Sequence, residues 1–133
     1  MKLTRAVKLD IDMRLMLSRL RHEEFESSTA CTPEFATFAR LFTKVMTAFF
    51  KTELGADKVK LHRGHFEVSG FMHCKLGWWY INTGDLRGRS MDSRMLLRRA
   101  LDDRDCRGGV NMWVDTESPE VFKTMFKSLV LRQ

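Results

Sequence analysis

The sequence predicts an α+β fold, in which two to three helices pack on one face of an antiparallel sheet of about four strands. Apolar residues recur at helical spacing within 33–54 and 119–130. Between these segments, residues 57–114 hold short apolar runs separated by Gly, Asn and Asp, which is typical of strands joined by turns. Helices at both ends of a strand-rich region favour an α+β arrangement.

The clearest element is a helix over residues 33–54. Thr32 offers an N-cap, Pro33 suits the first helical position, Glu34 lies in the first turn and Gly55 follows the end. Its apolar residues recur at steps of three and four, so one wide stripe must face a sheet or other helices. They are Phe35, Phe38, Leu41, Phe42, Val45, Met46, Phe49 and Phe50.

A similar start signal precedes a C-terminal helix over about residues 119–130. Ser118, Pro119 and Glu120 open it. An amphipathic run follows, formed by Val121, Phe122, Met125, Phe126, Leu129 and Val130.

The N-terminal segment fits both an alternating and a helical pattern. We expect a helix from about Asp10 to Glu26, because Met, Leu, Arg and Glu dominate and β-branched residues are nearly absent after Ile11. Residues Ser27 to Thr32 then form a linker. The helical N-terminal part thus spans about residues 10–54.

The sheet region contains one clear hairpin. Segments 66–73 and 78–83 flank a turn at 75–77, and Gly70 inside the first of them predicts a bulge. Arg107, Gly108 and Gly109 mark a second turn before the run VNMWV.

Length and composition predict one soluble domain spanning residues 1–133, located in the cytoplasm. No apolar run reaches the ~18 residues that a membrane helix needs, and the charged N-terminus does not resemble a secretory signal. Three cysteines at wide spacings argue against a disulfide framework. The sequence carries no sign of a cofactor. The net charge of +6 favours polyanionic or acidic partners.

The order of motifs in the sheet region resembles that of small uncharacterised accessory proteins of phages, plasmids and integrative elements. The resemblance covers about residues 59–114. It is carried by VSGF at 68–71, WWYINTGDLR at 78–87, MLLRRA at 95–100 and RGGVN at 107–111. Such proteins often act on host defence, and anti-CRISPR inhibitors are one such group. The resemblance therefore implies a bacterial host and a defence nucleoprotein complex as partner.

Arginines are concentrated in one segment of the sheet region. Because the guanidinium pairs bidentately with phosphate and stacks on bases, this density favours a polyanion-binding face, although a solvated face with internal Asp–Arg pairs is the competing interpretation. The candidate binding residues are Arg87, Arg89, Arg94, Arg98, Arg99, Arg104 and Arg107.

Consecutive aromatic residues add a second candidate feature. In a strand, Trp78 and Tyr80 point to one side and Trp79 to the other, so one side is core and the other is available for stacking. We take Trp79 as the candidate exposed ring and Trp113 as a core residue.

Three of the four histidines lie close together in the sequence. His62, His65 and His73, beside Cys74, could supply zinc ligands or the acid–base pair of a metal-free ribonuclease, although polar filling of a half-exposed sheet is the more common role. For the ribonuclease, the pair would be His62 or His65 with His73. The acidic residues Glu67, Asp85, Asp102, Asp103 and Asp105 form no recognised metal-nuclease motif.

These observations favour a non-enzymatic inhibitor from a phage or mobile element that blocks a nucleic-acid-guided defence complex by interfering with guide RNA or DNA binding. A free-standing nucleic-acid-binding module is the main alternative, and a His-based ribonuclease is a weaker one. An exposed apolar face at the N-terminus would also suit a homodimer.

Overall fold

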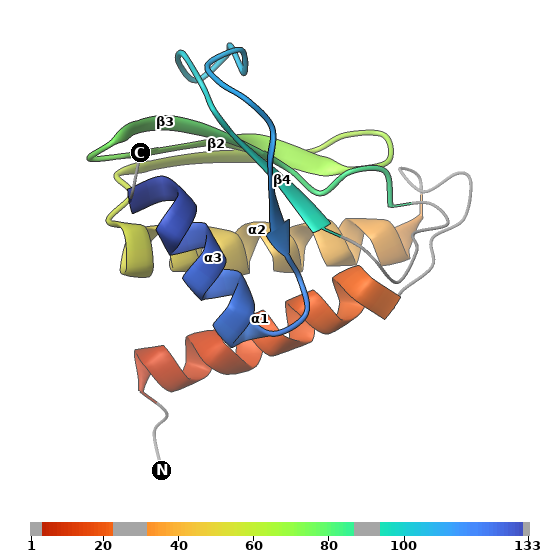
Figure 1. The fold of residues 1–133 in the computed structure, drawn as a ribbon. Helices are drawn as coiled ribbons and strands as arrows, with labels where there is room; N and C mark the ends of the chain where they lie inside the picture. Colours follow the sequence, from red (N-terminus) through yellow and green to blue (C-terminus); the bar gives the residue numbers. More distant parts are fainter. Residues whose placement is uncertain (1–3, 23–31, 87–93, 132–133) are drawn as a thin grey trace.

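The computed structural model describes residues 4–22, 32–86 and 94–131 of the chain. Figure 1 shows helices on one side of a twisted sheet. In chain order, the elements are α1 (Arg5–His22), α2 (Pro33–Leu54), β1 (Lys58–Arg63), β2 (Val68–Cys74), β3 (Gly77–Asn82), β4 (Arg94–Arg99), β5 (Met112–Asp115) and α3 (Pro119–Leu131).

The strands form one antiparallel meander in the order β1-β2-β3-β4-β5. The predicted α+β fold is confirmed, with five strands among the described residues where about four were expected. The expected hairpin is also present, since Cys74 pairs with Gly77 across a two-residue turn. Gly77 has φ +108°, a conformation that favours glycine.

The domain has three layers. Helices α2 and α3 lie against the sheet, and α1 packs mainly on these two helices (Figure 1). Lys123 of α3 forms an ion pair with Asp10 of α1, and Lys127 Nζ lies 3.2 Å from Glu53 Oε2 of α2. The N-terminal and C-terminal helices are therefore neighbours.

Aromatic rings fill the space between α2 and α3. The ring centroid of Phe126 lies 5.5 Å from that of Phe49, 5.3 Å from that of Phe50 and 5.6 Å from that of Phe122. All four side chains are fully buried. The stripe predicted on 33–54 is therefore core, and α3 supplies the rings that meet it.

The ends of α2 follow the local sequence signals. The side-chain oxygen of Thr32 accepts a hydrogen bond of 3.3 Å from the Phe35 N–H, which satisfies one free donor of the first turn. Gly55 closes the helix in the left-handed conformation, with φ +64°. The bounds predicted for this helix are confirmed.

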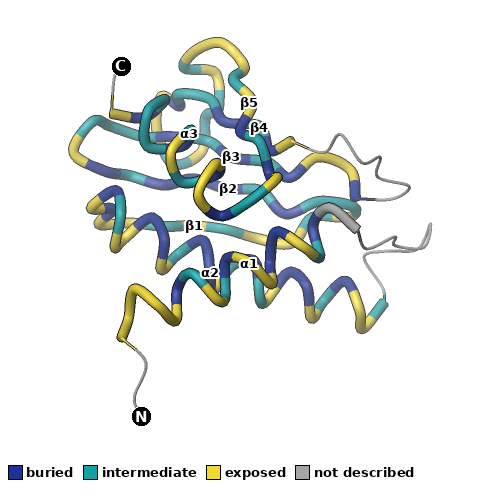
Figure 2. The backbone as a smooth tube through the Cα atoms, turned by 60° about the horizontal axis from the view of Figure 1, so that its bottom comes forward, coloured by how far each residue is buried: buried dark blue, intermediate teal, exposed yellow. Residues whose placement is uncertain are grey.

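Helix α1 begins five residues earlier than predicted. Thr4 caps it, because its hydroxyl accepts from the Val7 N–H at 3.1 Å. The alternating apolar pattern of this segment arises from two sets of residues on one helix. Val7, Ile11 and Leu15 are exposed, and the apolar residues between them in the sequence, such as Leu9 and Met13, are buried. Figure 2 shows buried and exposed positions alternating along α1. The predicted end at Glu26 and residues 27–31 of the linker lie outside the described residues.

Pairing between β1 and β2 is continuous through Gly70, so the predicted bulge was wrong. This glycine instead permits close approach of the neighbouring strand. A Cβ atom at this position would lie 1.9 Å from the main-chain oxygen of Lys60.

Among the described residues, no helix combines the length and apolar character needed to cross a lipid bilayer.

We expect Phe126→Ala to lower the free energy of unfolding by about 3–5 kcal/mol, because it leaves a cavity between α2 and α3. Urea denaturation followed by circular dichroism measures this loss. Val110→Ala is the matched control. Val110 is 77% exposed, so the change should stay within about 0.5 kcal/mol. Equal losses for the two variants would contradict the described core.

Candidate nucleic-acid interface

Among the described residues, the three helices all lie on one side of the sheet, and none covers its other face (Figure 1). Met72, Trp79 and Ile81 are fully buried on the side that faces the helices. Because side chains alternate along a strand, their neighbours point to the opposite side, which we call the open face. The open face comprises Lys58, Lys60, His62, Ser69, Phe71, His73, Trp78, Tyr80, Asn82, Arg94, Leu96, Arg98, Trp113 and Asp115.

Aromatic rings lie in three rows across the open face. His73 and Trp78 are cross-strand partners with ring centroids 4.8 Å apart. In the next row, Phe71 and Tyr80 have centroids 5.3 Å apart. The third row contains Trp113, a residue that is 47% exposed. Such pairs stabilise the sheet and leave ring surface on the side away from the helices.

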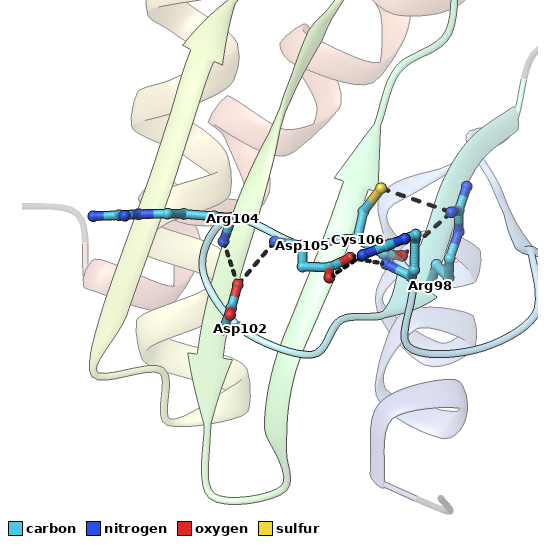
Figure 3. A network of polar contacts seen from close by, with 6 residues as sticks. Arg98, Asp102, Arg104, Asp105 and Cys106 are labelled. Atoms are coloured by element: carbon cyan, nitrogen blue, oxygen red, sulfur yellow. Dashed lines mark hydrogen bonds and ion pairs between the residues drawn. The ribbon is translucent and has the colours of Figure 1, made fainter.

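The loop of residues 101–110 covers the middle row. Lys60 Nζ lies 2.8 Å from Asp103 Oδ2, which ties the loop to β1. Arg98 Nη1 donates to the Cys106 carbonyl oxygen at 3.2 Å, which ties it to β4. Figure 3 shows the loop crossing in front of the strands. This cover explains why Phe71 is buried although it belongs to the open face.

Acidic residues fold this loop internally. Asp102 Oδ1 accepts from the main-chain N–H groups of Arg104 and Asp105 at 2.8 and 2.9 Å, as Figure 3 shows. The Asp105 carboxylate in turn pairs bidentately with Arg107, with both distances 2.9 Å. For Arg107, the interpretation as an internal Asp–Arg pair is therefore correct.

Cationic partners lower the pKa of the loop carboxylates. The hydrogen bond from Arg107 lowers the pKa of Asp105 to about 2, and that from Lys60 lowers the pKa of Asp103. Near β1, the hydrogen bond from His73 likewise lowers the pKa of Asp57. These contacts favour the charged carboxylates, so the loop conformation weakens when the carboxylates take up protons.

The predicted arginine cluster does not form one surface. Arg94 and Arg98 lie on the open face, whereas Arg99 lies on the opposite side of β4 with its guanidinium carbon 5.1 Å from the Trp79 ring centroid. Arg104 is an exposed loop residue. Arg87 and Arg89 lie outside the described residues. Strand alternation separates Arg98 from Arg99 and thereby corrects the prediction of a single arginine face.

The assignment of exposed and buried tryptophans also needs correction. Trp79 has no exposed surface because it points toward the helices, so it cannot stack on a ligand. Trp113, expected in the core, is exposed, and its neighbour Val114 is buried instead. Sequence reasoning identified the alternation at 78–80 but assigned the wrong side of the strand to the core.

Exposed basic residues border the open face. Lys58 and His62 are exposed on β1, and Arg94 is exposed on β4. In residues 4–22, 32–86 and 94–131, Lys58 and His62 form no ion pair. Lys58 thus places positive charge beside the first aromatic row, and Arg94 lies beyond the third row, where its cross-strand partner is Asp115.

The histidines do not converge. His62 pairs with Ser69 and His73 with Lys58, so four residues of strand separate the two rings, about 13 Å along the sheet. His65 lies beyond the other end of β1, in the turn before β2. A ribonuclease pair must reach one phosphate, so this geometry contradicts both proposed pairs. Within the part of the chain that the structure describes, no three His, Cys, Asp or Glu side chains are grouped to hold a metal ion.

No protein-family model, curated protein or solved structure matches this chain. The open face is therefore interpreted from its own chemistry. It offers aromatic rings bordered by cations, with a folded loop over the middle row.

We expect the loop to loosen as the pH falls from the ordinary aspartate pKa of 3.8 toward about 2. A carboxylate whose pKa is lowered on folding contributes stability above its unfolded pKa and loses that contribution as the pH falls. The amide signal of Arg107, whose N–H donates to Asp105 Oδ1 at 3.0 Å, should move through this range in NMR spectra. In an Asp105→Asn variant, the Arg107 amide should lose this dependence. An Arg107 amide signal that titrates identically in both proteins would contradict the described pairing.

Proposed function

We propose that the protein binds single-stranded nucleic acid on the open face of its sheet. The exposed Trp113 side chain on β5, next to the strand β4 that carries Arg94, is the observation that carries this proposal. Aromatic stacking combined with phosphate contacts is the common chemistry of single-strand binding.

Ring exposure supports a single strand over a duplex. Trp113 is 47% exposed and Trp78 is half-buried, so both leave ring surface toward solvent. Tyr80 lies in the row that the loop covers, with the Arg98 guanidinium carbon 5.7 Å from its ring centroid. Unpaired bases can stack on exposed rings, whereas bases within a duplex are already stacked on each other.

Cations supply the contacts to phosphate. Lys58 borders the face on β1 and Arg94 borders it on β4. Arg104 adds a cation from the loop, and Figure 3 shows its side chain directed away from the loop's own network. Contacts of this kind hold the backbone without reading sequence, so we expect weak sequence preference and strong salt dependence.

The covering loop divides the face into two stacking regions. Phe71 is shielded by the loop, while Trp113 lies in one flanking row and Trp78 in the other. A single-stranded nucleic acid that runs along β4 and β5 would meet Trp113 before it meets Trp78. We therefore expect Trp113 to contribute more to binding than Trp78.

The resemblance of residues 59–114 to accessory proteins of mobile elements suggests a biological setting for this activity. Inhibition of a host nucleic-acid-guided defence complex of the CRISPR type remains a prediction. Capture of guide RNA or exposed single-stranded DNA on the open face would be its physical means. Such inhibition requires no catalytic residue in the protein.

We expect Trp113→Ala to weaken binding of single-stranded RNA and DNA by about fivefold to 150-fold, the effect of losing one stacked base. Fluorescence anisotropy with labelled oligonucleotides at low and physiological salt measures this. The same samples on a denaturing gel report any cleavage. Duplex DNA should bind more weakly than single strands of equal length.

Leu131→Ala provides the matched control for this experiment. Leu131 is an apolar residue of α3 that is 51% exposed and far from the open face in the fold. Its substitution should leave the affinity unchanged. Equal affinities of the wild type and Trp113→Ala would contradict the proposed stacking, and tighter binding of duplex DNA would contradict the proposed substrate.

A further inference from the structure

A groove lies along the outer edge of the sheet, between β1 and α2. Figure 2 shows β1 running alongside α2, and the two elements are in contact. The groove has a volume of about 540 Å³. Its size is within the range of sites that bind small molecules or peptide segments.

Small and apolar residues form the inner part of the groove. Ala36 and Ala39 face it from α2, and Leu61 faces it from β1. Because alanine side chains extend little beyond the backbone, helix and strand leave room between them here. An extended chain could therefore approach the strand closely.

The charged residues that line the groove are basic. Arg40 and Lys44 are exposed on α2, and His62 and Arg63 are exposed at the end of β1. None of the described residues that line the groove carries a carboxylate. Within the described residues, neither Lys44 nor Arg63 forms an ion pair. The groove is thus complementary to a negatively charged chain.

The strand beside the groove has a free edge. In the described part of the chain, β1 pairs with β2 alone and stands at the end of the sheet. In an edge strand of an antiparallel pair, every second residue directs its N–H and C=O away from the neighbour. Such an edge is a template for an additional strand.

We propose that this groove binds an extended acidic segment of a partner protein, which pairs with β1 as an additional strand. The main chain of the segment bonds to the edge of β1. Its acidic side chains meet Arg40, Lys44 and Arg63, and its small apolar side chains contact the alanines of α2. This inference does not rest on the aromatic rows of the open face, although His62 borders both surfaces.

The lining favours a peptide over nucleic acid as the occupant. Among the described residues, no Phe, Tyr or Trp lines the groove, so it lacks the broad stacking surface on which single-stranded bases depend. A free strand edge, in contrast, matches the repeat of a peptide main chain and not that of a sugar-phosphate backbone. The open face and the groove thus suit two different partners.

A labelled octapeptide of alternating glutamate and valine is the probe for this site. Fluorescence anisotropy should show saturable binding, and NMR spectra should place the largest amide shifts in residues 59–63. Combined Arg40→Glu and Lys44→Glu substitutions should weaken the binding about tenfold or more. The same octapeptide with N-methyl groups along its backbone keeps its charge and cannot pair as a strand, so it should not bind.

Arg5→Glu combined with Lys8→Glu is the matched control, because it makes the same charge change at exposed positions of α1. It should leave peptide affinity unchanged. Absence of saturable binding, equal binding of the N-methylated peptide, or equal loss in the control would overturn the proposal. If the groove variant instead lost affinity for a single-stranded oligonucleotide and kept it for the peptide, the groove would be a nucleic-acid site. Trp113→Ala should not change peptide affinity, so failure of this proposal and failure of the open-face proposal are distinguishable.

Discussion

The packing of α2 and α3 on a single side of the sheet is the constraint on which the other features of this domain depend. Phe49 and Phe50 of α2 contact Phe126 of α3, and the two helices together cover one side of the sheet. Since side chains alternate along a strand, burial of Trp79 on one side sets Trp78 and Tyr80 on the other. The open face is thus a consequence of where the helices lie.

Features governed by local sequence could be predicted well. Helix α2 begins and ends where Thr32 and Gly55 indicate, because capping depends on residues within one turn of the helix end. The hairpin at 74–77 followed from its turn residues for the same reason. The early start of α1 was missed, although Thr4 carries the same kind of capping signal as Thr32.

Features that depend on which side of a strand meets a helix could not be predicted. The alternation at 78–80 gave two equivalent choices, and only contact with distant segments makes Trp79 the core residue. The same holds for Arg98 and Arg99, which are adjacent in sequence and lie on opposite sides of β4. Arginine density was also misleading, because the neighbouring aspartates neutralise part of it within the loop. The groove beside β1 had no signal in the sequence at all, since it is made by segments that are separated along the chain.

The position of α3 between α1 and the sheet has a consequence for synthesis of the protein on the ribosome. The meander itself is built from neighbours in sequence, so its hairpins can form as soon as they emerge. Phe122 and Phe126 follow the five described strands in the sequence, yet they fill the centre of the helical layer. Until they leave the exit tunnel, the nascent chain exposes the aromatic stripe of α2 and the inner side of α1, which were made first. Helix α3 therefore completes a core whose other described helices and strands are translated before it.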